Sequence, residues 1–88
     1  DAAKTLLRAF RRDVDARRFV LVPVGADVLK AAAAMATHCY RAERPVALRT
    51  LDGVHLATAR LLKCRRMATT DKRMREAAGL LDIPLAAV

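Results

Sequence analysis

The sequence predicts an α/β fold in which helices cover the faces of a parallel sheet. Two observations lead to this prediction. Short apolar runs rich in β-branched residues alternate along the chain with stretches of helical periodicity, and the 55% apolar content indicates a compact core rather than disorder. With 88 residues, the chain forms at most one small domain.

The first half of the chain predicts a helix, a strand and a second helix. The helix over residues 2–18 is amphipathic, with apolar positions at Ala3, Leu7, Phe10 and Val14. Residues 19–24 read F-V-L-V-P-V and predict a strand, which Pro23 places at a sheet edge or ends. We expect Asp27 to cap a helix over residues 28–43. Its expected buried side comprises Val28, Ala32, Met35, Ala36 and Cys39.

The second half predicts helices over residues 51–62 and 72–80 and short strands over residues 67–70 and 83–88. The expected buried side of the first of these helices comprises Leu51, Val54, Ala57, Thr58, Leu61 and Leu62. That of the second comprises Met74, Ala77, Ala78 and Leu81. Ligand sites of parallel sheets lie at the carboxyl ends of the strands. Asp71, directly after residues 67–70, is therefore where chemistry is expected.

The charge of the chain is strongly positive. Seventeen Lys and Arg residues against nine Asp and Glu give +8, and most of the cations are arginines. This balance indicates either an anionic partner such as nucleic acid or a solvated, Arg-rich surface. Cys39 and Cys64 follow no disulfide or zinc pattern, so we expect reduced, buried thiols in a cytoplasmic protein. No apolar run approaches the roughly 18 residues of a transmembrane helix.

Asp52 and Asp71 each occur where a helix is expected to begin. One interpretation is structural, because a carboxylate there accepts a main-chain N–H and favours the helix. The other is functional: two carboxylates in one pocket can hold Mg²⁺ or Mn²⁺, which activates water and stabilises the charge of a phosphodiester being cleaved. The sequence leaves both interpretations open.

Polar residues around the two aspartates extend the functional interpretation. His55 lies one helical turn after Asp52 and is either a general acid or base or a structural residue. Thr69 and Thr70 precede Asp71 and are either supporting groups or ordinary strand-end residues. The candidates for phosphate contacts are Arg49, Lys72 and Arg73.

The stretches of sequence that contain the two aspartates resemble those of a known protein family. Residues 49–59 (R-T-L-D-G-V-H-L-A-T-A), 68–74 (A-T-T-D-K-R-M) and 81–85 (L-D-I-P-L) resemble the C-terminal half of a PIN domain, in particular of the VapC-type ribonuclease toxins. The run L-D-x-x-H-L-A-x-A, followed by T-x-D-x-R, is the specific part. Residues 1–43 match only in the order and type of their elements.

The resemblance implies a three-layer α/β/α domain around a parallel sheet and a Mg²⁺- or Mn²⁺-dependent endoribonuclease site of clustered acids. Asp52 and Asp71 would be two of these acids, with Thr69 as a supporting group. It also implies RNA and a cognate antitoxin as partners. An unpaired sheet edge would favour pairing with another chain, so a homodimer is expected.

The family's first Asp and its Glu have no counterpart in the chain, so we expect the N-terminal third of the domain to be absent. Two alternatives to a nuclease therefore stay open. One is a non-catalytic binding or assembly fragment. The other is a basic nucleic-acid-binding module, whose binding would fall steeply with salt.

Overall fold

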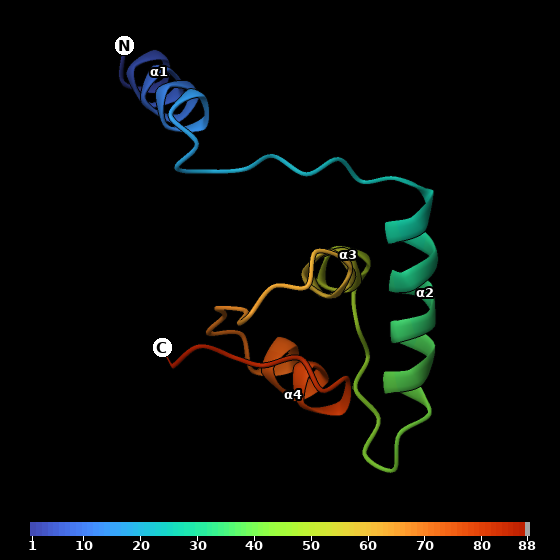
Figure 1. Cartoon of the computed structure of the whole chain (residues 1–88). Helices are drawn as coiled ribbons and strands as arrows, with labels where there is room; N and C mark the ends of the chain where they lie inside the picture. The colour runs from blue at the N-terminus through green and yellow to red at the C-terminus, as the bar shows by residue number, and fades with distance from the viewer. Residues whose placement is uncertain (88) are drawn as a thin grey trace.

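The structure of the chain, a computed structural model, describes residues 1–87 and is helical in that range. The described helices are α1 (Ala2–Asp15), α2 (Ala26–Tyr40), α3 (Thr50–Leu61) and α4 (Lys72–Leu80). Figure 1 shows α2, α3 and α4 gathered into one body, with α1 set apart from it. The helices follow one another in the order predicted from the sequence. The bounds predicted for α4, residues 72–80, are confirmed.

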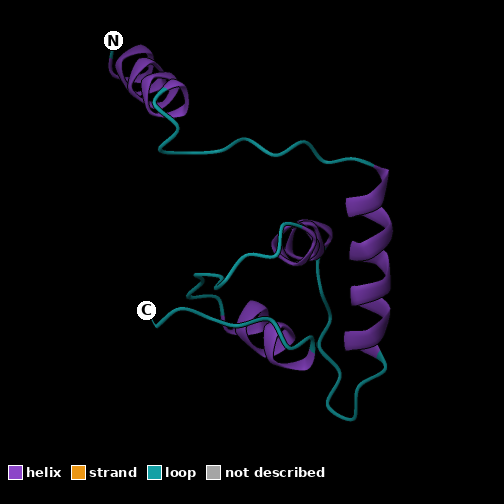
Figure 2. Cartoon of the chain, in the orientation of Figure 1, coloured by secondary structure: helices purple, strands orange, loops and turns teal. Residues whose placement is uncertain are grey.

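The predicted three-layer α/β/α fold with a parallel sheet is wrong for this structure. Residues 1–87 contain no strand, as Figure 2 shows, and only one isolated parallel bridge, between Met67 and Leu85. Two main-chain hydrogen bonds make that bridge: Met67 N–H donates to the Pro84 carbonyl at 2.8 Å and Ala86 N–H donates to the Met67 carbonyl at 2.9 Å. The pairing therefore covers a single residue of the expected strand at 67–70.

The predicted strand at residues 19–24 has no neighbour with which to pair. It runs in an extended form from α1 to α2, away from α3 and α4 (Figure 1). A strand is stabilised by a ladder with an adjacent strand, and Pro23 contributes no donor to one. The last strand was expected at 83–88; Val88 lies outside the described residues, and in the rest only Leu85 is bridged.

The core lies among α2, α3, α4 and the segments that follow α2 and α4. Its largest fully buried side chains are Leu56 and Cys39. The α2 and α3 backbones approach closely at Gly53, where an added Cβ would lie 3.4 Å from Ala32 Cβ and 3.5 Å from the Ala32 carbonyl oxygen. A glycine at this position lets the two helices pack against each other.

The burial predicted from periodicity is confirmed for α4 and, except for half-buried Ala36, for α2. It is wrong for much of α3, where Leu51 is 70% exposed and Leu61 and Leu62 are also exposed. The buried residues of this helix are Gly53, Leu56 and Ala57. Apolar residues occur on most sides of α3, so its periodicity did not define a single buried side.

Helix α1 contributes nothing to the core, since all its residues are exposed or half-buried. Its apolar side chains Leu6, Leu7 and Phe10 are exposed, and Phe10 stacks on Phe19 with ring centroids 5.8 Å apart. The Cα radius of gyration is 15.1 Å, whereas a compact domain of this length would have about 12 Å. The projecting α1 and its extended connection to α2 account for the larger value.

Candidate nucleotide-binding and metal site

Asp52 and Asp71 line one pocket, although 19 positions of sequence separate them. Asp52 is in the first turn of α3, and Asp71 is the residue immediately before α4. The pocket, which we call the acidic-basic pocket, has a volume of about 230 Å³. Its lining residues are Arg49, Asp52, Asp71, Lys72 and Arg73.

The carboxylate of Asp52 accepts a hydrogen bond from the main-chain N–H of Arg49 through Oδ2 at 3.3 Å. This contact closes the first turn of α3 and is the structural role expected of an acid there. Asp52 is half-buried and forms no ion pair within residues 1–87. In the same range its other oxygen, Oδ1, accepts no hydrogen bond, so it is available to a ligand.

Asp71 is the N-cap of α4, as predicted. Its Oδ1 accepts the Met74 N–H at 2.9 Å, and its own N–H donates to Thr69 Oγ1 at 3.1 Å. The Thr69 carbonyl in turn accepts from the Arg75 guanidinium at 2.8 Å. These contacts hold the turn before α4, while Oδ2 of Asp71 accepts no hydrogen bond from the described part of the chain.

The other predicted site residues divide into two groups. Three of them, Arg49, Lys72 and Arg73, line the acidic-basic pocket. Thr69 contacts Asp71 by accepting its main-chain N–H. Thr70 and His55 are exposed and do not line the pocket.

Cations outnumber carboxylates three to two around the acidic-basic pocket, which lies at the N-terminal ends of α3 and α4. Helix N-termini carry partial positive charge and favour anions. Arginine also presents a planar set of donors that matches a phosphate. The electrostatics of the pocket therefore suit a phosphate group.

The donor set also fits a hard divalent cation. Mg²⁺ is commonly held by one or two carboxylates together with waters and substrate phosphates, and each aspartate here has an oxygen to offer. Residues 1–87 contain no cluster of three or more His, Cys, Asp or Glu side chains arranged for a metal. The N-terminal acids are engaged locally: Asp1 caps α1 through Lys4 N–H at 2.9 Å, and Asp13 pairs with Arg18 at 3.3 Å.

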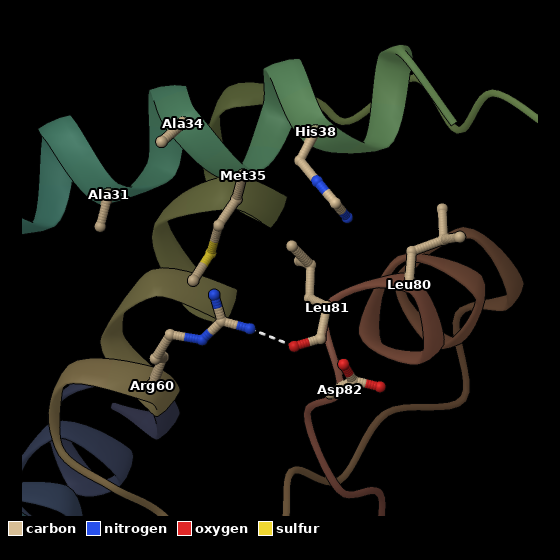
Figure 3. A pocket seen from close by; sticks show the side chains of 8 residues that line it. All are labelled: Ala31, Ala34, Met35, His38, Arg60, Leu80, Leu81 and Asp82. Carbon is tan, nitrogen blue, oxygen red and sulfur yellow. Dashed lines mark hydrogen bonds between the residues drawn. The ribbon is translucent and has the colours of Figure 1, made fainter. Parts of the chain in front are cut away.

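A different pocket, shown in Figure 3, lies between α2 and the C-terminal end of α4. It has a volume of about 420 Å³ and a largely apolar lining that includes Met35 and Leu81. Arg60 of α3 reaches into it and donates to the carbonyl of Leu81. This hydrogen bond gives Arg60 a structural role at the end of α4.

The PIN domain family model matches residues 3–80, and the chain belongs to the PIN domain family. The match extends well beyond the two motifs that carried the resemblance. Searches of curated proteins and of solved structures found no match.

PIN domains are a nuclease-like family, and they generally use divalent metals. None of the helices in residues 1–87 is long and apolar enough to cross a membrane.

Proposed function

We propose that the chain carries part of a metal-dependent endoribonuclease site of the VapC type. In this proposal Asp52 and Asp71 ligate Mg²⁺ or Mn²⁺, and Arg49, Lys72 and Arg73 hold RNA phosphates. The observation that carries it is the pocket shared by the two aspartates and the three cations. RNA is the proposed substrate, and a cognate antitoxin is a proposal that rests on the VapC resemblance alone. A homodimer is proposed because the extended segments of residues 1–87 are left almost unpaired, and a cytoplasmic location is proposed because both cysteines are free.

Each aspartate supports the proposed chemistry with one oxygen while the other maintains its helix. Hydrogen bonds from Arg49 N–H and Met74 N–H fix the two carboxylates, so little conformational entropy remains to be lost when a ligand binds. A divalent ion bound there would lower the pKa of a bound water and stabilise charge on the phosphate.

The cations of the pocket would position the RNA strand. Arg49 and Arg73 can each donate to two phosphate oxygens, and Lys72 supplies a point charge at the start of α4. Because these cations outnumber the two carboxylates, the pocket attracts the RNA even when the coordination of the divalent ion is incomplete. An RNA phosphate would then complete the oxygen set, as substrate phosphates do in other magnesium sites.

Cleavage of single-stranded RNA in Mn²⁺ by Asp52→Asn and Asp71→Asn variants tests this proposal. Asparagine is as good an N-cap as aspartate at position 71, and at position 52 its amide oxygen can still accept the Arg49 N–H. The variants therefore keep the helix starts and lose only the anionic ligand. We expect cleavage to fall by at least about 10–100-fold, the loss typical of weaker changes behind metal ligands. Asp82→Asn is the matched control, because Asp82 is exposed and lies outside the acidic-basic pocket.

A second candidate function is RNA binding without cleavage, and the excess of cations in the pocket favours it. It predicts binding that weakens steeply with salt. It also predicts that Asp52→Asn binds RNA as well as the unmodified chain, and that Mn²⁺ produces no cleavage in either. Cleavage lost in both aspartate variants and kept in Asp82→Asn would exclude it.

A further inference from the structure

A second pocket adjoins the acidic-basic pocket along α4. It has a volume of about 480 Å³ and lies between residues 45–47, which follow α2, and the first two turns of α4. Lys72 and Arg73 line both pockets. A strand whose phosphate contacts these two cations would therefore place its next nucleoside in the second pocket.

The wall formed by residues 45–47 is apolar. Pro45 and Ala47 are exposed, while Val46 is buried and its N–H donates to the Cys39 carbonyl at 3.0 Å. This anchored segment offers an apolar surface to a base, since recognition of single-stranded RNA relies on unstacked bases placed against side chains. The pocket volume falls within the range of small-molecule sites, about 300–1,000 Å³.

Glu76 is the acidic group of the second pocket. It is exposed and forms no ion pair within residues 1–87, although Lys72 and Arg73 lie one helical turn before it. Its two carboxylate oxygens can accept two parallel hydrogen bonds. The Watson–Crick edge of guanine presents two adjacent N–H donors, whereas that of uracil presents one N–H between two carbonyl oxygens that would repel the carboxylate.

We infer that the second pocket is a nucleoside subsite and that Glu76 gives it a preference for guanine. The guanine edge faces Glu76, the base lies against residues 45–47, and the adjoining phosphate contacts Lys72 and Arg73. This inference rests on the proposed function for the identity of the polymer. It assigns a base-selecting residue that takes no part in metal binding.

Binding of four labelled oligonucleotides, measured by fluorescence anisotropy, tests the subsite. Each is a nine-nucleotide oligouridylate whose central residue is guanosine, adenosine, cytidine or uridine. The measurements are made in EDTA at about 150 mM salt, so that neither metal nor cleavage contributes and non-specific attraction is weakened. We expect the guanosine probe to bind at least about fivefold more tightly than the uridine probe, the lower end of what a bidentate base contact provides.

Glu76→Gln should reduce that preference to within about twofold, because one of the two acceptors becomes a donor. Glu43→Gln is the matched control: it removes the same charge from an exposed residue outside the second pocket, and it should keep the preference. Ala47→Trp fills the pocket and should bring the guanosine probe to the affinity of the uridine probe. The circular dichroism of every variant is compared with that of the unmodified chain.

Equal affinities for the four probes, binding too weak to measure for all of them, or a guanine preference that survives Glu76→Gln or Ala47→Trp would overturn the subsite. The proposed function is judged separately, by Mn²⁺-dependent cleavage in the Asp52→Asn and Asp71→Asn variants. A guanine preference without cleavage would sustain the subsite and reject the nuclease. Cleavage without the guanine preference would support the nuclease and reject the subsite.

Discussion

At the scale of single residues, Asp52 and Asp71 show how a structural role and a proposed chemical role can share one side chain. One oxygen of each carboxylate closes a helix start, at 3.3 Å for Asp52 and 2.9 Å for Asp71. The other points to no donor within residues 1–87. The capping predicted from the sequence is confirmed, and ligation of a metal stays a prediction that the two pocket-lining carboxylates support.

The two cysteines differ in their surroundings. Both were expected to be buried, but Cys64, which follows the end of α3, is exposed, whereas Cys39 is 0% exposed inside the core. Burial also raises the pKa of the Cys39 thiol. Because the thiolate is the reactive form, a raised pKa leaves less of it at any pH below that pKa.

We predict that Ellman's reagent at pH 8 modifies Cys64 rapidly and Cys39 only after unfolding in guanidinium. Cys64→Ser should remove the rapid phase. Two thiols reacting at one rate in the folded protein would contradict the burial of Cys39.

At the scale of helices, the sequence predicted the bounds of α4 but not those of α2, which was expected over residues 28–43 and spans Ala26–Tyr40. It also did not predict the backbone conformation in which the helices end. Many helices are followed by a residue in the left-handed conformation, and this residue is usually glycine. Here that position is taken by Arg17 after α1, Lys63 after α3 and Asp82 after α4, with φ of 59°, 53° and 57°. After α4, for example, Ile83 N–H donates to the Ala78 carbonyl at 2.9 Å. None of these three residues is a glycine, so the residue types did not predict where the helices end.

The residue predicted to cap α2, Asp27, is also not its N-cap. Its N-cap is Gly25, and Asp27 lies inside the first turn with its carboxylate accepting the Val28 N–H at 2.8 Å. An acid is favourable at either position. Residue type alone therefore could not separate the cap from the first turn.

The glycines in α3 and α4 provide a paired test of helix packing. Gly53→Leu should lower the free energy of unfolding by about 1–3 kcal/mol, the usual cost of overpacking, because α2 lies against this position. Gly79→Ala should raise it by about 0.5–1 kcal/mol, since no heavy atom lies within 4 Å of the added Cβ.

Urea unfolding followed by circular dichroism measures both changes. If Gly53→Leu were as stable as the unmodified chain, the close approach of α2 and α3 would be wrong. If Gly79→Ala were destabilising, the open surroundings of that position would be wrong.

At the scale of the whole molecule, the sequence predicted the family and the helices but not the tertiary arrangement. Short β-branched runs such as residues 19–24 indicate strands only when a neighbour completes the ladder. In residues 1–87 that neighbour exists only at Met67 and Leu85. The proximity of Asp52 and Asp71 could be anticipated from their motifs, whereas the second pocket depends on where residues 45–47 pass beside α4.

The net charge of the molecule, +8 over 88 residues, is consistent with a general attraction of polyanions. General attraction does not choose a site, so the specific claim concerns where a divalent ion binds. Asp1, Asp13, Asp15 and Asp82 are internal references, because they carry the same group as Asp52 and Asp71 but do not line the acidic-basic pocket.

The most direct test is a titration of the ¹⁵N-labelled chain with Mn²⁺, whose paramagnetism broadens the amide signals of nearby residues. We predict that broadening begins at Arg49, Asp52, Asp71, Lys72 and Arg73, and that Asp71→Asn abolishes it there. Broadening that begins at Asp1, Asp13, Asp15 or Asp82, or that is uniform along the chain, would contradict a metal site shared by Asp52 and Asp71.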